Sequence, residues 1–220
     1  WLDFAQRACA PEAKPMTSGR YNEDRTRCLI NLFNSRSSSL EDSRMINGMR
    51  FYVRAQFAAM PDPNADSADA YWAVAQHELS YVQLDSTEAF AAAFNAHVED
   101  EALKLSGIFG SEGGSSETDE DASSDTSNSI GVAEASANRI DLNVSTYWYG
   151  HGAAHGNWSK TFLHYLVGED RELAAKDIFT GKRWQAGLLD LAVEALKAEH
   201  GEAIMLDDPS DIADAVIDPQ

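Results

Sequence analysis

The chain lacks several features that would define a function. It has no run of 18 apolar residues, so we expect no membrane-spanning segment. It has no phosphate-binding loop and no Rossmann fingerprint, so we expect no nucleotide cofactor. It also has no Gly-x-Ser-x-Gly motif, which disfavours a serine nucleophile of that type. Its two cysteines have no second ligand at Cys-x-x-Cys spacing, which disfavours a zinc site built on them. The 220 residues, 44% of them hydrophobic, suffice for one domain or two small ones.

Basic residues are absent from two long stretches. The net charge is -19, and residues 105–138 and 199–220 each carry seven acidic side chains without Lys or Arg. This charge repels a phosphate backbone and excludes nucleic acid as a natural partner, whereas a cationic protein partner remains allowed. The acidic segment 119–125 lacks the glycine and the distal glutamate of an EF-hand loop, which disfavours calcium.

The N-terminal region begins without Met and without a signal peptide. Residues 1–7 have the pattern of the middle of an amphipathic helix, so we expect a processed or trimmed fragment of a longer protein. Cys9 and Cys28 flank a polar loop with Pro and Gly, an arrangement that favours one local disulfide in an exported protein. Closing that loop would stabilise the fold by about 3 kcal/mol in the chain-entropy model. The alternative is two buried thiols in a cytosolic protein.

Helical periodicity appears in three places. Residues 23–40 carry an apolar face at helical spacing, and residues 188–196 carry another that ends at Gly201. Asp85 and Glu88 have the reciprocal spacing of a helix start. The apolar face of the helix that follows comprises Phe90, Phe94, Val98, Ala102 and Leu105.

Strand-like alternation appears in four places, namely residues 50–57, 77–84, 140–149 and 158–167. The second of these also fits a helix over residues 70–84. The last two predict a hairpin with a long glycine-rich tip, and turn residues predict a loop at residues 61–66. Residues 111–129 are predicted to form a flexible acidic insertion. The fold class is therefore α+β, an antiparallel sheet flanked by helices, with a small disulfide-linked helical part at the N-terminus.

The hairpin tip, residues 146–157, is the most informative stretch, because an aromatic strand end enters a glycine-rich turn with two histidines. Its aromatic side chains can anchor a protein loop or stack on sugar rings, although cross-strand packing would also explain them. The candidate binding residues are Tyr147, Trp148, Tyr149, His151, His155, Asn157 and Trp158.

An enzyme hypothesis has to use His151 and His155, with His164 as a further candidate. Two histidines four residues apart share a face only on a helix, and the surrounding glycines make a helix improbable. No third zinc ligand is evident nearby. Ser145 and Ser159 lack an identifiable activating base. We therefore expect no metal and no catalytic residues.

The turn at residues 149–157, the segment at residues 173–179 and the next helix carry a family resemblance. They resemble the extracytoplasmic domain of unknown function shared by RsiV-type lysozyme-sensing anti-sigma factors and PdaC-type peptidoglycan deacetylases. Residues 81–84 and the following helix with Asn95 resemble its N-terminal half, so the resemblance covers residues 44–206. The acidic insertion is not a feature of that family, whose pattern also continues with a further strand region after the point where this chain stops.

The first 42 residues carry a second, shorter resemblance. Trp1 through Cys9 and then Arg27–Cys28 resemble the end of an LprI-type lysozyme-inhibitor domain. Together the resemblances imply domains at residues 1–43 and 44–206 and an acidic tail at 207–220. They also imply a sheet packed on helices, with His155 and Asn157 tying the turn by side-chain to backbone hydrogen bonds.

The resemblance implies binding rather than catalysis. In the anti-sigma factors the domain recognises lysozyme, and in the deacetylases it accompanies a separate catalytic domain. We therefore expect a non-catalytic module of the bacterial cell envelope, periplasmic or extracellular, that recognises a lysozyme-like protein or peptidoglycan. The alternatives are a metal-dependent hydrolase using His151 and His155, or a structural spacer in a longer protein.

Overall fold

The computed structural model describes residues 1–9, 19–41, 45–63, 74–106, 108–109, 121–181 and 183–201. The chain forms two compact units, Trp1–Glu172 and Leu173–Gln220. The predicted domain boundaries at 43/44 and 206/207 both fall outside the described residues.

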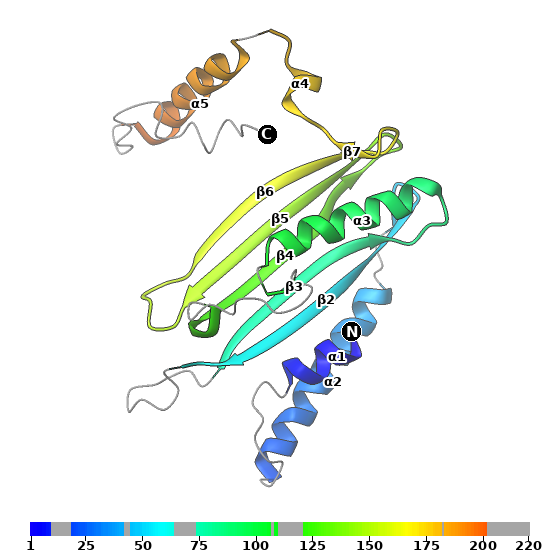
Figure 1. Ribbon diagram of the computed structural model, residues 1–220, viewed down its shortest axis with the longest axis vertical. Helices are drawn as coiled ribbons and strands as arrows, with labels where there is room; N and C mark the ends of the chain where they lie inside the picture. Colours follow the sequence, from blue (N-terminus) through cyan, green and yellow to red (C-terminus); the bar gives the residue numbers. More distant parts are fainter. Residues whose placement is uncertain are drawn as a thin grey trace. The chain divides into compact units, whose positions relative to one another are not determined.

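The first unit is built on a seven-stranded sheet whose spatial order follows the sequence (Figure 1). Every neighbouring pair is antiparallel except β3 and β4, which are parallel. The predicted α+β class is confirmed, and the sheet is mixed instead of wholly antiparallel. A parallel pair needs a long crossover, and helix α3 lies in that connection. The strands are β1 (Met45–Ile46), β2 (Met49–Pro61), β3 (Val74–Leu84), β4 (Ser124–Ala135), β5 (Arg139–Gly150), β6 (Asn157–Leu166) and β7 (Arg171–Glu172).

The predicted strands are found in β2, β3, β5 and β6, and the predicted hairpin is the β5–β6 pair. β2 is longer than predicted and includes Pro61, so the predicted loop begins later. For residues 74–84 the strand alternative is confirmed and the helix alternative is wrong.

The predicted insertion at 111–129 is wrong at its C-terminal end. Residues 121–123 form a 3-10 helix, η1 (Asp121–Ser123), and β4 begins at Ser124. Residues 111–120 lie outside the described residues. Ser, Asp and Asn dominate the start of β4, so its strand propensity is low, and tertiary pairing with β3 and β5 overrides it.

Helix α3 (Ala89–Lys104) covers one face of the sheet (Figure 1). Its buried residues include Phe94, Val98 and Ala102, as the predicted apolar face requires. The predicted cap is wrong, because Glu88 is the N-cap without a side-chain cap bond, and the Ser86 hydroxyl accepts the Glu88 N–H instead. Asn95 fixes the helix to the sheet, since its amide accepts the Leu84 N–H at 2.6 Å and donates to the Leu84 carbonyl at 3.0 Å.

The core lies between α3 and the central strands. Phe94 packs edge-to-face on Phe51, at 6.1 Å between ring centroids, and on Tyr165, at 5.2 Å. The fully buried side chains of the core cluster include Leu79, Tyr81, Phe94, Val98, Ile140, Leu142 and Tyr165.

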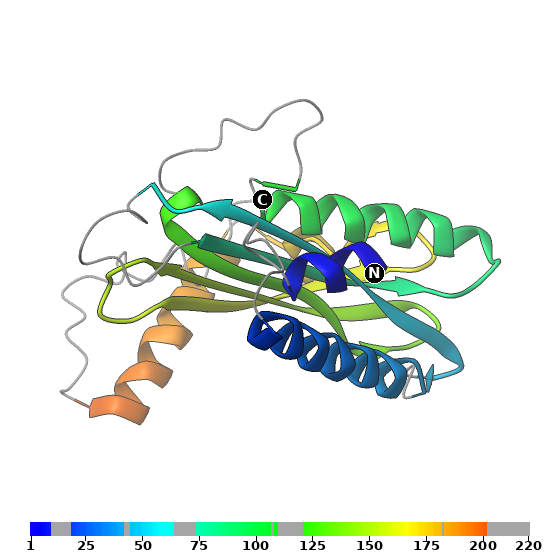
Figure 2. The same cartoon turned by 90° about the horizontal axis from the view of Figure 1, so that it is seen from below.

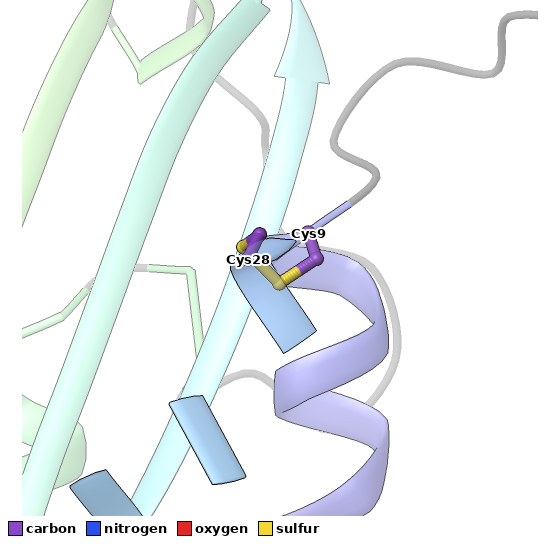
Figure 3. The surroundings of a disulfide bond; sticks show 2 residues. All are labelled: Cys9 and Cys28. Atoms are coloured by element: carbon purple, nitrogen blue, oxygen red, sulfur yellow. A yellow bond between two sulfur atoms is a disulfide. The ribbon is translucent and has the colours of Figure 1, made fainter. Parts of the chain in front are cut away.

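Two helices, α1 (Leu2–Ala8) and α2 (Gly19–Glu41), form the N-terminal part. The predicted disulfide between Cys9 and Cys28 is present, with the Cα atoms 5.6 Å apart (Figure 3). Phe4 packs on Phe57 of β2, and Arg36 donates to the Val53 carbonyl. Figure 2 shows α2 and α3 on opposite sides of the sheet.

The second unit contains α4 (Ala175–Ile178) and α5 (Trp184–His200), with Gly201 at the end of α5 as predicted. The predicted apolar stripe of α5 is half-buried, as is Trp184, whereas the helix's other residues with a described burial are exposed; the stripe comprises Leu188, Leu189, Ala192, Val193 and Leu196. The Phe179 and Trp184 rings stack at 4.7 Å. The predicted acidic tail, 207–220, lies outside the described residues. Among the described helices, none has the length and apolar character needed to cross a membrane.

Candidate functional site

The β5–β6 turn is tied together by its own aromatic side chains. The Tyr149 hydroxyl donates to the Ala153 carbonyl at 3.0 Å, and the Ala153 N–H donates to the Gly150 carbonyl at 2.9 Å. Gly152 has φ of +88°, a conformation that L side chains rarely adopt. Tyr149 is therefore a structural residue of the turn, and its hydroxyl is already engaged.

Two further glycines let aromatic rings lie directly against the backbone. A Cβ atom at Gly150 would lie 2.6 Å from the Trp148 ring, and one at Gly156 would lie 2.5 Å from the Tyr147 ring. Any larger residue at either position would displace the ring. The glycine-rich sequence of the turn thus positions Tyr147 and Trp148.

His151 is buried beneath the turn, with its side chain only 5% exposed. Its Nδ1 contacts the carboxylate of Asp62, and its Nε2 lies 3.2 Å from Oδ1 of Asp125. The same Asp125 oxygen accepts the Gln76 N–H at 2.8 Å. His151 therefore joins the turn to the residue just after β2 and to the start of β4.

His77 of β3 extends this network. Its Nε2 lies 3.0 Å from the Asp121 carbonyl, which can only accept, so this nitrogen carries the proton. Its Nδ1 is 2.9 Å from the Thr126 hydroxyl and accepts from it in the neutral ring. Burial lowers the pKa of His77, although the Asp121 carbonyl and the charges of Asp121 and Asp125 oppose that shift. His77 is thus a neutral, buried part of the scaffold.

The histidines of the enzyme hypothesis have different hydrogen-bond partners. Both ring nitrogens of His151 contact carboxylates in a buried network, whereas His155 is exposed and its Nδ1 is 3.3 Å from the Gly156 carbonyl. His164 contacts Oδ1 of Asp141 at 2.6 Å. Burial would raise the pKa of Asp141, but hydrogen bonds from His164 and Arg139 outweigh it and lower that pKa.

The remaining predicted residues lie along the outer part of the sheet. Asn157 opens β6, is exposed and pairs with Trp148. Tyr147 pairs with Trp158, so the two side chains share a sheet face. Tyr147 is 41% exposed and Trp158 is 77% exposed.

Two residues outside the predicted set continue this face. Lys160 and Phe162 follow Trp158 at the two-residue period of a strand, and the Lys160 ammonium lies 5.8 Å from the Phe162 ring centroid. Phe162 is 56% exposed. We call Tyr147, Trp158, Lys160 and Phe162 the aromatic stripe. The alternation of β6 was the available signal for its last two members.

The backbone beside the aromatic stripe is also open. β7 pairs only with Tyr165 and Leu166 of β6. Within the part of the chain that the structure describes, no strand pairs with the outer edge of β6 from Asn157 to His164. Exposed aromatic side chains therefore stand next to unpaired backbone donors and acceptors.

Comparisons with known proteins find distant structural likeness. No family model matches the chain, and no curated protein matches it. It is similar to a DUF3298 family protein from Pseudomonas aeruginosa, with 14% identity, 78% of this chain and 74% of that chain covered, and a TM-score of 0.47. It is also similar to a DUF3298 family member from Bacteroides fragilis, with 18% identity, coverage of 71% and 70%, and a TM-score of 0.48. At these values neither structure transfers a function to this chain.

Proposed function

We propose that this protein is a non-catalytic binding module of the bacterial cell envelope and that it recognises a lysozyme-like protein through the aromatic stripe. The observation that carries the proposal is the joint exposure of Trp158, Phe162 and Tyr147 on one face. Large apolar side chains grouped on a surface are typical of interaction sites. Trp and Tyr are also the residue types that most often dominate binding energy.

The open edge of β6 supports a protein as the ligand. An extended segment of a partner can pair with an unpaired strand, and the neighbouring side chains then supply specificity. In β6 the aromatic stripe stands beside such an edge, so backbone pairing and aromatic contacts are available to one partner.

Charge supports a cationic partner such as a lysozyme-like muramidase. The net charge of -19 attracts a cationic protein and speeds its approach, an effect that salt weakens. The Cys9–Cys28 disulfide supports the envelope location, because disulfides persist in oxidising compartments.

Calorimetric titration of the full chain with a cationic c-type lysozyme, at low and at physiological salt, tests the proposal. We expect saturable one-to-one binding that persists at physiological salt. The double variant Trp158→Ala with Phe162→Ala should weaken binding by about 2 kcal/mol or more, the loss typical of central aromatic anchors. The matched control is Ile30→Ala, an exposed apolar residue of α2 outside the aromatic stripe, which should bind as the parent does.

Two outcomes contradict the proposal. Binding that disappears at physiological salt would show attraction by charge alone, and equal binding by parent and double variant would remove the aromatic stripe from the interface. Cell-wall glycan is the second ligand class, because exposed aromatic rings also stack on sugar rings. Trp fluorescence with soluble peptidoglycan fragments would then distinguish glycan binding from no binding.

A further inference from the structure

Three side chains of types that can bind metal ions lie close together where α3 passes β7. His97 and Glu101 lie one helical turn apart on α3, and Glu172 is the last residue of β7. One ligand atom from each lies within 4.8 Å of the other two. Among the described residues, this is the group of three histidine, cysteine or carboxylate side chains whose ligand atoms lie so close together.

The Nε2 atom of His97 is in an unusual position. It is shielded from solvent and lies 2.9 Å from Oε1 of Glu172, yet the pair does not have the direction of a hydrogen bond. A buried polar atom without a hydrogen bond is costly, and a carboxylate close to an imidazole nitrogen adds to that cost when the ring is neutral. A cation bound to the nitrogen lone pair and to the carboxylate would satisfy both groups.

The surroundings hold these ligands in place. The His97 ring lies against the Tyr165 ring at 5.3 Å between centroids, and Tyr165 is fully buried. Lys104 contacts Glu101 at 2.6 Å and also Asp100 at 2.8 Å. Lys104 can therefore keep its contact with Asp100 while Glu101 turns to a metal ion.

We propose that His97, Glu101 and Glu172 bind a divalent transition-metal ion, with Zn²⁺ the best match. One imidazole nitrogen and two carboxylate oxygens are a ligand set that Zn²⁺ accepts, with water in the fourth position. Ca²⁺ and Mg²⁺ prefer ligand sets made of oxygen alone. The ion would join α3 to β7, the last strand of the first compact unit, and would stabilise the folded chain. This site uses no residue of the aromatic stripe.

Calorimetric titration of the chelator-treated full chain with ZnCl2 tests this site, with thermal unfolding measured alongside. We expect one equivalent of Zn²⁺ to bind and to raise Tm. His97→Ala, and separately Glu172→Gln, should remove the rise in Tm. Each should weaken Zn²⁺ binding by more than about 100-fold, the largest loss expected when only an outer-shell partner is removed. The matched control is His155→Ala, an exposed histidine at the β5–β6 turn, which should bind as the parent does.

The isosteric Glu172→Gln variant keeps the test valid if His97→Ala fails to fold. Absence of stoichiometric binding by the parent chain would overturn the proposal. Equal binding by the parent and the folded Glu172→Gln variant would also overturn it.

Discussion

β5 and β6 are hydrogen-bonded neighbours with the same alternating sequence pattern, but they lie in different surroundings. Ile140, Leu142 and Val144 of β5 are buried in the core. In β6 every residue from Asn157 to Phe162 is exposed, on both faces of the sheet. The core cluster reaches β6 only at its C-terminal end, through Leu163 and Tyr165. Alternation therefore predicts that a segment is a strand, whereas its burial depends on what packs against it.

An aromatic side chain stabilises the fold when it lies in the core and contributes little when it lies on the exposed part of β6. Burying a large apolar side chain contributes about 1.5–3 kcal/mol to folding. Phe94 makes that contribution between Phe51 and Tyr165. Phe162 is more than half exposed and makes little of it. Its apolar area remains available to a partner, which is why the aromatic stripe and not the core is the proposed recognition surface.

Substituting one phenylalanine from each place tests this difference most strongly. Phe94→Ala should lower the free energy of unfolding by about 3–5 kcal/mol, because it removes a fully buried ring and leaves a cavity. Phe162→Ala should change it by only about 0.5 kcal/mol or less. Urea unfolding followed by circular dichroism measures both values. Similar losses in the two variants would mean that the outer part of β6 is covered in solution.

The N-terminal helices differ from α3 in being tied covalently. α3 is held by packing and by Asn95, whereas α1 and α2 are also joined by the Cys9–Cys28 disulfide. Replacing both cysteines by Ala should lower the free energy of unfolding by about 3 kcal/mol, because the unfolded chain gains the freedom of the opened loop. The expected loss is at or below the lower end of that for Phe94→Ala.

Reduction provides the control for that measurement. Dithiothreitol should destabilise the parent protein by a similar amount and leave the double cysteine variant unchanged. If the parent protein is equally stable with and without reductant, the disulfide does not contribute measurably to the free energy of unfolding.

Much of the fold could be predicted because its pattern is local. The period-2 runs of β5 and β6 and the apolar face of α3 follow from side-chain spacing alone. β4 could not be predicted in the same way, because Ser124 to Ser129 are polar and are strand only through pairing with β3 and β5. The parallel β3–β4 pair likewise depends on the path of α3 and not on any local signal.

Some residues of the candidate site could likewise be predicted from the sequence, whereas their tertiary partners could not. The aromatic residues of the turn were evident in the sequence, and the alternation that includes Trp158 also includes Phe162. The partners of His151 were not evident, since Asp62 is 89 residues away in the sequence and Asp125 is 26 residues away. Spacing could suggest that His151 and His155 act together, but only the tertiary structure shows one buried among carboxylates and the other exposed.

The smallest effect is expected from a buried histidine of β3. Burial lowers the pKa of His77 from its ordinary value of 6.5. Well above pH 6.5 His77 is neutral in both the folded and the unfolded chain, so its pKa shift does not change the free energy of unfolding. As the pH falls below 6.5, the unfolded chain takes up a proton first, and the free energy of unfolding decreases until the pH falls through the folded pKa.

Urea unfolding at a series of pH values from about 7 to about 5 measures this decrease, in the range where histidine is the side chain that ordinarily titrates. His77→Gln should reduce the slope of unfolding free energy against pH, because the glutamine does not titrate. If the variant keeps the slope of the parent, the environment of His77 does not cause the decrease and the prediction fails.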